Sequence, residues 1–134
     1  MHLDMKIDGG DTPITNYPKF TEHVRRLAEL RRRTADYYCF ADFRDQEGIA
    51  ADVPANALVR TYRNARTGRA AVVIAETGGQ KAAAAVQIKW PLAEKTAVVH
   101  SSVRETETVS LGAPLTVELT PYEVQIICLR TLSK

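Results

Sequence analysis

The chain has 134 residues, and 18 Lys and Arg against 16 Asp and Glu give a formal net charge of +2. This length predicts one domain that can bury about two-thirds of the surface of its unfolded chain. The charge is too weak for nucleic-acid binding, so we expect no nucleic-acid partner. The sequence has no signal-peptide pattern and no apolar run long enough to cross a bilayer, so no membrane partner is expected either.

Residues 1–16 contain Gly9, Gly10 and Pro13 and are predicted to be extended rather than helical. Their apolar residues Leu3, Met5 and Ile7 alternate with polar ones, as they would in a strand with one buried face. This segment is therefore predicted either to add an edge strand to a sheet or to face a partner from elsewhere.

Residues 17–38 are predicted to form a long helix. Pro18 is suited to a first helical position, and Asn16 or Thr15 can cap the free amides. A helical wheel places apolar side chains on one stripe, with charged ones opposite. The stripe contains Phe20, Val24, Leu27, Thr34 and Tyr38, with Leu30 and Tyr37 at its edge, and the opposite face contains Arg25, Arg26, Glu29, Arg32, Arg33 and Asp36. That charged face is either solvated or a docking face for a neighbouring domain.

Arg31 lies inside the apolar stripe of this helix, between Val24 and Leu27 on the wheel. A guanidinium cannot lose its charge, so burial there requires a carboxylate partner. Asp42, Asp45 and Glu47 follow soon after in the chain. We therefore predict that Arg31 is mostly buried and is bonded to one of these carboxylates, as a structural ion pair, or to backbone carbonyl oxygens.

Residues 39–134 are predicted to form an antiparallel β-sandwich of about seven strands, because short apolar runs alternate with turn signals. The predicted strands are 58–63, 69–76, 82–90, 97–100, 105–110, 115–119 and 122–129. The runs 71–75 and 126–129 are apolar on both faces, which is typical of central strands. The more polar strands 97–100 and 105–110 are predicted to lie at edges. The whole fold is thus expected to be mainly β, with one long N-terminal helix packed on the sandwich.

The sequence contains no recognisable metal or cofactor motif. His2, His23 and His100 have no metal-ligand spacing, so no cofactor is expected. The acidic group of Asp42, Asp45, Glu47 and Asp52 fits neither a calcium loop nor a strong glycosidase pattern, and salt bridges are the favoured role. Cys39 and Cys128 are predicted to be free buried thiols, with a single bridge between them as the alternative.

Three aromatic residues are candidates for stacking on a sugar ring: Trp90, Tyr62 and Tyr122. Stacking requires at least two exposed rings on one face or along one groove. Trp90 alternates with Val86 and Ile88 along its strand, so core packing is the favoured role for this residue.

Three phrases of the sequence are similar to one known family. The helix LAELRRRTADYY followed by FADFRDQEGI resembles the last helix and exit segment of (β/α)₈-barrel glycoside hydrolases. The ending PLTVELTPYEVQIICL resembles the last two strands of the β-sandwich domain that closes many of those chains. TYRNARTGRAAVVIAETG resembles a hairpin of the same domain. The likeness covers residues 17–130, but Ala41 stands where a glycine is typical and Glu76 where a polar amide is typical.

This resemblance implies a C-terminal accessory domain whose partner is the catalytic barrel of a parent chain. The barrel strands that would carry a catalytic acid and nucleophile are not in this sequence, so no catalytic residue is implied and the chain alone is expected not to be an enzyme. The alternative is an independent carbohydrate-binding module. An enzymatic role would instead need two partly buried carboxylates in a cleft. A further possibility is a homodimer, formed through the helix if the neighbouring domain is missing.

Overall fold

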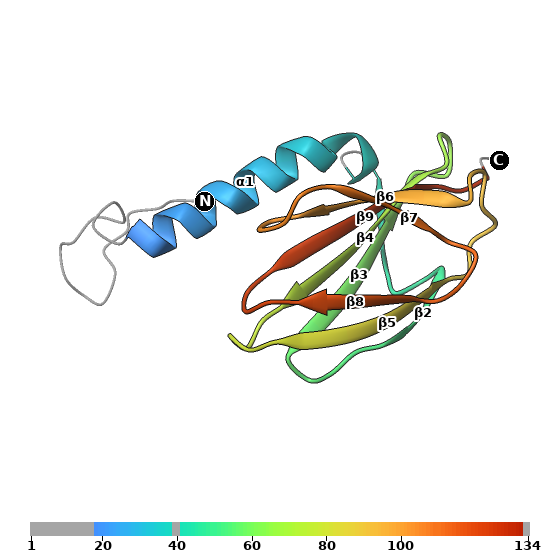
Figure 1. Ribbon diagram of the computed structural model, residues 1–134. Coiled ribbons are helices and arrows are strands. Elements are labelled where there is room, and N and C mark those ends of the chain that lie inside the picture. The colour runs from blue at the N-terminus through green and yellow to red at the C-terminus, as the bar shows by residue number, and fades with distance from the viewer. Residues whose placement is uncertain (1–17, 39–40, 133–134) are drawn as a thin grey trace.

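A computed structural model describes residues 18–38 and 41–132. Figure 1 shows two layers of strands, with one long helix on the outer side of one layer. The described residues form one helix and nine strands, and the strands are arranged in two antiparallel sheets. The predicted mainly β, sandwich-like fold is confirmed. The predicted extended segment 1–16, like Cys39, lies outside the described residues.

The helix α1 runs from Pro18 to Tyr38, so Pro18 is its first residue, where its missing N–H costs nothing. Leu30 and Thr34, which are four residues apart and so lie above one another on one helix face, are both buried. The Thr34 hydroxyl donates a hydrogen bond of 2.9 Å to the Leu30 carbonyl oxygen and satisfies its own buried polar group.

The larger sheet has six strands in the order β1-β3-β4-β9-β6-β7. Its strands are β1 (Asp42–Asp45), β3 (Ala57–Arg63), β4 (Arg69–Glu76), β6 (Thr96–Ser101), β7 (Glu107–Ser110) and β9 (Val124–Arg130). The apolar strands β4 and β9 lie side by side in the middle, with Val72 opposite Ile127, as predicted for central strands. β7 is an edge strand as predicted, but β6 lies between β9 and β7, so the edge prediction is wrong for β6.

The smaller sheet has three strands in the order β2-β5-β8, namely β2 (Ile49–Asp52), β5 (Ala82–Ile88) and β8 (Leu115–Leu119). The main core lies between the two sheets. It includes Val59, Val72, Ile74, Val86, Leu119 and Ile127, all at most 2% exposed. Strands β3 to β9 correspond to the seven predicted ones, whereas β1 and β2 lie in a segment that the sequence did not mark as strands.

The second core lies on the other face of the larger sheet, beneath α1. Leu30 packs there with Ala71 of β4 and with Ile126 and Cys128 of β9. Cys128 is a free, buried thiol. Figure 1 shows α1 above the larger sheet, on the face away from β2, β5 and β8. The helix therefore covers the outer face of the sandwich's larger layer.

One helix cannot cover that face completely. Its diameter with side chains is about 10–12 Å, whereas neighbouring strands are about 4.8 Å apart. Six strands are therefore about twice as wide as the helix. Since α1 lies mainly over the central strands β4 and β9, it leaves outer parts of this face open, including the part beside β3.

Candidate functional site

The open part of the outer face is an apolar groove beside α1, with a volume of about 330 Å³. The helix contributes Leu27, Leu30 and Arg31 to its walls, and the sheet contributes mainly Tyr62, Val73, Val124 and Ile126. Tyr62, Val73 and Val124 are all partly exposed. We call this feature, with Phe43 beside it, the outer groove.

Phe43 extends the outer groove onto the edge strand β1. Its side chain is 57% exposed, and it lies opposite Tyr62 of β3 in the strand register. The two ring centroids are 5.4 Å apart with the rings tilted by 56°. An exposed phenylalanine beside an apolar groove is the kind of surface at which a protein partner docks.

On its other side, α1 is held by polar contacts rather than apolar ones. The Arg33 guanidinium donates a hydrogen bond of 3.1 Å to the Ser101 carbonyl oxygen at the end of β6. It donates a second, of 3.3 Å, to the Thr106 hydroxyl in the loop before β7. The helix is thus fixed along β6, and its apolar surface remains accessible on the β3 side.

The outward face of α1 is rich in arginine. The helix contains six Lys and Arg residues against three carboxylates. Glu22 binds Arg26 at 3.1 Å, as the i,i+4 spacing predicts, and it also binds Arg25. Hydrogen bonds from both arginines lower the pKa of the Glu22 carboxyl to about 2. The surplus positive charge gives this face an attraction for an acidic partner surface.

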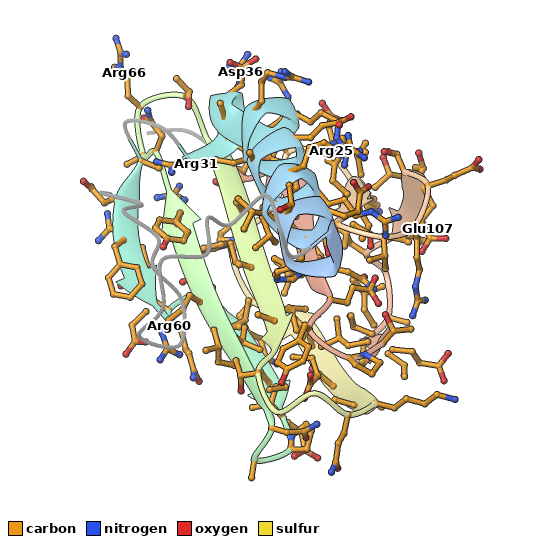
Figure 2. The ribbon with its side chains drawn as sticks, turned by 90° about the vertical axis from the view of Figure 1, so that its left-hand side faces the viewer. Arg25, Arg31, Asp36, Arg60, Arg66 and Glu107 are labelled. Carbon is orange, nitrogen blue, oxygen red and sulfur yellow. The ribbon has the colours of Figure 1, made fainter. Side chains whose placement is uncertain are left out.

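The predicted burial of Arg31 is wrong. Its side chain is exposed, on the side of α1 that faces the outer groove, as Figure 2 shows. Leu30 and Thr34 face the sheet instead, so a residue next to Leu30 is turned about 100° away from it. Asp42 pairs with Arg44 at 3.4 Å and Asp45 with Arg60 at 3.6 Å. An ion pair of Arg31 with either carboxylate stays a prediction.

The structure does not bring the three sugar-stacking candidates together. Trp90 is half-buried against the main core and covers Gly48. Tyr62 lies in the outer groove. Tyr122 is bound through its backbone amide to Glu76, which is paired with Ala57, five residues before Tyr62 in β3. Tyr122 is 55% exposed, and its ring lies over Gly79. The centroids of the Tyr122 and His23 rings are 6.3 Å apart in a T-shaped arrangement. The pairing of Tyr62 with the Phe43 ring was not predicted.

Sequence reasoning also missed two buried glutamates at one end of the sandwich. Glu76, at the end of β4, is 3% exposed. One of its carboxylate oxygens accepts hydrogen bonds from the backbone amides of Gly79 and Tyr122, and the other from the Gly78 amide and the Asn56 side chain. Burial by itself raises the pKa of Glu76, but these donors outweigh it and lower the pKa to about 2.

Glu123, just before β9, is fully buried beside Glu76, whose backbone amide donates to the Glu123 carbonyl oxygen. Its carboxylate accepts hydrogen bonds from Ser101 at 2.6 Å and Gln125 at 2.9 Å, and it pairs with Arg104 at 3.1 Å. Burial opposes ionisation here too, but the Ser101 hydroxyl and the other donors lower the pKa of Glu123. We call Glu76 and Glu123 the carboxylate pair.

The carboxylate pair has the chemistry of a structural clamp rather than of a glycosidase. A glycosidase acid must hold its proton near neutral pH, which requires a raised pKa. Both members of this pair have lowered pKa values, and protein donors occupy their oxygens. The sequence signal that could have found Glu76 is a lone charge that ends an apolar strand just before Gly78 and Gly79.

Within residues 18–38 and 41–132, no group of three or more His, Cys, Asp or Glu side chains is arranged to hold a metal ion. The same residues contain no helix with the length and apolar character that a bilayer crossing requires. The sequence matches no protein-family model and no curated protein. The glycoside hydrolase family therefore remains an expectation that rests on the phrases quoted above.

Proposed function

We propose that this chain is a non-catalytic accessory module of a glycoside hydrolase-like protein, and that it docks on the catalytic barrel of its parent chain through the outer groove and α1. The observation that carries the proposal is the half-covered outer face. A single helix leaves Tyr62 and Val73 partly exposed beside Phe43, where a neighbouring domain would remove them from water.

Two further features support this function. Arg31 stands at the border of the outer groove, and Arg25 lies on the other side of α1, as Figure 2 shows. Apolar contact surrounded by charge is the usual anatomy of an interface between domains. The carboxylate pair supports a non-catalytic role, because hydrogen bonds within the protein lower the pKa values of both buried acids and hold them in structural contacts.

The proposal is tested first on the coding sequence upstream of Met1. A preceding barrel with paired carboxylates is expected, and an upstream region that encodes none contradicts the proposal. The joined protein is then compared with this chain by hydrogen exchange. Amides around Tyr62, Val73 and Arg31 should exchange more slowly in the joined protein, whereas those of β5 should not change.

A matched pair of variants separates docking from folding. Phe43 and Leu132 are both large exposed apolar residues, at 57% and 54%, but Leu132 lies at the C-terminal end, away from the outer groove. In the joined protein, Phe43→Ser should restore fast exchange at the outer groove, and Leu132→Ser should leave it slow. Equal effects of the two changes would contradict docking at this face.

Carbohydrate binding is the second candidate, and the Phe43–Tyr62 ring pair is the observation that favours it. It ranks second because the rings are tilted by 56°, whereas a sugar ring stacks best on a flat platform. Titration of the isolated chain with soluble oligosaccharides of glucose, xylose, mannose and galactose tests it. Chemical-shift changes confined to Phe43 and Tyr62 would establish this alternative, and their absence would leave docking as the function.

A further inference from the structure

A second open site lies between the two sheets, on the side opposite to β1 and β2. The smaller sheet covers the inner face of the larger one only in part, because three strands face six. Beyond β8 this leaves a cleft of about 210 Å³ between β8 and the strands β6 and β7. Its walls include the apolar side chains of Val99, Val109, Leu115, Val117 and Ile127.

The cleft is bordered by a free strand edge. Within the described part of the chain, β8 pairs with β5 on one side and has no strand on the other. Its side chains alternate, with Val117 and Leu119 buried and Thr116 and Glu118 exposed. An unpaired edge of this kind accepts an extended segment as an additional strand, whose backbone hydrogen bonds supply much of the affinity.

We propose that residues 3–7 of this same chain, LDMKI, occupy the cleft as a fourth strand of the smaller sheet, beside β8. Leu3, Met5 and Ile7 alternate with Asp4 and Lys6, as a strand with one buried face requires. Three apolar side chains would then point into the cleft toward Val99 and Val109, where the smaller sheet now leaves the larger one uncovered.

The position of α1 makes this occupant reachable. His23 contacts Tyr122, which follows the last residue of β8 by three positions, so the first turns of α1 lie at the end of the molecule where β8 finishes. Figure 1 shows the blue end of α1 and the tip of β8 at this same end. The ten residues 8–17 can span up to about 33 Å when extended. That length is enough to bring Ile7 from Pro18 to the end of β8.

This entry point also determines the direction of the added strand. Because the chain leads from Ile7 toward α1, Ile7 lies nearest Leu119 and Leu3 nearest Leu115, so the segment runs parallel to β8. In that register the apolar positions of LDMKI coincide with those of Leu115–Leu119, whose sequence is LTVEL. Lys6 is then the neighbour of Glu118, a favourable pair of opposite charges on the exposed face.

Methionine labelling tests this arrangement directly in the full chain, because Met1 and Met5 are its two methionines. With ¹³C-methyl methionine, the Met5 methyl should show nuclear Overhauser effects to the methyl groups of Val99 and Val109. A Met5 methyl at its random-coil shift with no such contacts would overturn the proposal, as would contacts to Leu27 and Val73 in the outer groove.

A pair of charge substitutions gives an independent readout. Met5→Asp places a carboxylate inside the cleft and should accelerate amide exchange in β8 by at least about 10-fold, since unpaired edge amides are open to water. His2→Asp adds the same charge on the exposed face of the segment and should leave exchange unchanged. Equal exchange in both variants and the unaltered chain would contradict the proposal.

A mixed sample of labelled and unlabelled chains shows which molecule supplies the strand. Effects within one chain support the proposed occupant. Effects that arise only between chains would overturn it in favour of strand exchange between two copies. This test is independent of docking at the outer groove, because the cleft and the outer groove lie on opposite faces of the larger sheet.

Discussion

Gly48, in the turn between β1 and β2, lies directly against the ring of Trp90. Gly48 has a φ of 86°, which an L residue with a Cβ rarely adopts. A Cβ built on it would lie 1.9 Å from Cε2 of Trp90, far inside any contact distance. The Gly48 carbonyl oxygen also accepts hydrogen bonds from the backbone amides of Lys89 and Trp90. The glycine is therefore required by both conformation and space.

We predict that Gly48→Ala displaces Trp90 and lowers the free energy of unfolding. The left-handed backbone alone costs about 1–2 kcal/mol, and the lost packing of the indole adds to it. Urea denaturation followed by the fluorescence of Trp90, the one tryptophan in the sequence, measures both effects. Gly112→Ala is the control: its Cβ would meet its nearest neighbour at 3.7 Å, so a change within about 0.5 kcal/mol is expected.

Cys128 is the second residue with a clear chemical expectation. It is 3% exposed, and burial raises the pKa of its thiol to about 12. The thiolate is the reactive form, and a rise of about three pKa units reduces its population roughly 1000-fold. We predict that, in a Cys39→Ser background, iodoacetamide at pH 8 modifies Cys128 far more slowly in the native protein than in urea. Fast native labelling would contradict its place beneath α1.

At the scale of elements, α1 is joined to the sandwich by a short apolar contact and by the Arg33 hydrogen bonds. Leu30 provides most of the apolar part, at 2% exposure against Ala71 and Ile126. Near the other end of the helix, the Arg69 guanidinium lies 5.9 Å from the centre of the Tyr37 ring. The helix therefore depends on a few residues for its attachment, whereas the strands hold each other along their whole length.

We predict that Leu30→Ala loosens α1 selectively. Removing a buried leucine side chain typically costs about 2–5 kcal/mol. Amide exchange should accelerate in α1 well before it accelerates in β4 and β9, because the core between the sheets is left intact. Arg32→Ala changes an exposed side chain of the same helix and should leave exchange in α1 unaltered. Equal acceleration in α1 and the sheets would instead mean that the helix and sandwich unfold as one unit.

At the scale of the whole molecule, the carboxylate pair connects segments that are far apart in the sequence. Glu76 accepts hydrogen bonds from the residue before β3 and from the turns after β4 and β8. Glu123 accepts hydrogen bonds from the end of β6 and from the turn before β9. Both sheets thus depend on these two acids at one end of the sandwich. Protonation there should affect the stability of the whole fold.

We predict that the protein loses stability as the pH falls from about 4.5 to about 2. The folded-state pKa of Glu76 is lowered from 4.5 to about 2, so its contribution is complete above the unfolded value and is lost as the pH falls through the folded one. The shift of Glu123 has the same direction. The urea midpoint measured against pH checks this slope.

The matched variant for this acid dependence is Glu76→Gln. An uncharged amide can accept some of the hydrogen bonds of Glu76 but places its own NH₂ against other donors, so the variant should be less stable at pH 7. It should also show a flatter dependence on pH below 4.5. Glu94→Gln, at an exposed position, should keep the slope of the unaltered chain. An unchanged slope in Glu76→Gln would show that other groups control acid unfolding.

Local patterns in the sequence determined much of this fold. The helix begins at Pro18, and the seven runs predicted as strands correspond to β3–β9, because apolar periodicity and turn residues act within a single segment. Gly68, in the loop after β3, has a φ of 78°, a left-handed conformation that favours glycine. The strands β4 and β9 are apolar on both faces, and this local pattern predicted their central position, because both faces must be buried.

The tertiary structure decided what depends on partners distant in the chain. The short strands β1 and β2 exist because β3 and β5 offer them edges, and their own sequences carry no clear alternation. Arg31 lies within a wide apolar stripe, but Leu30 and Thr34 are the residues of that stripe that the sheet buries, so the Arg31 side chain stays exposed. The Glu76 carboxylate accepts hydrogen bonds from turns that are far apart in the sequence. A pattern within one segment cannot predict such contacts, because they depend on how the segments pack together.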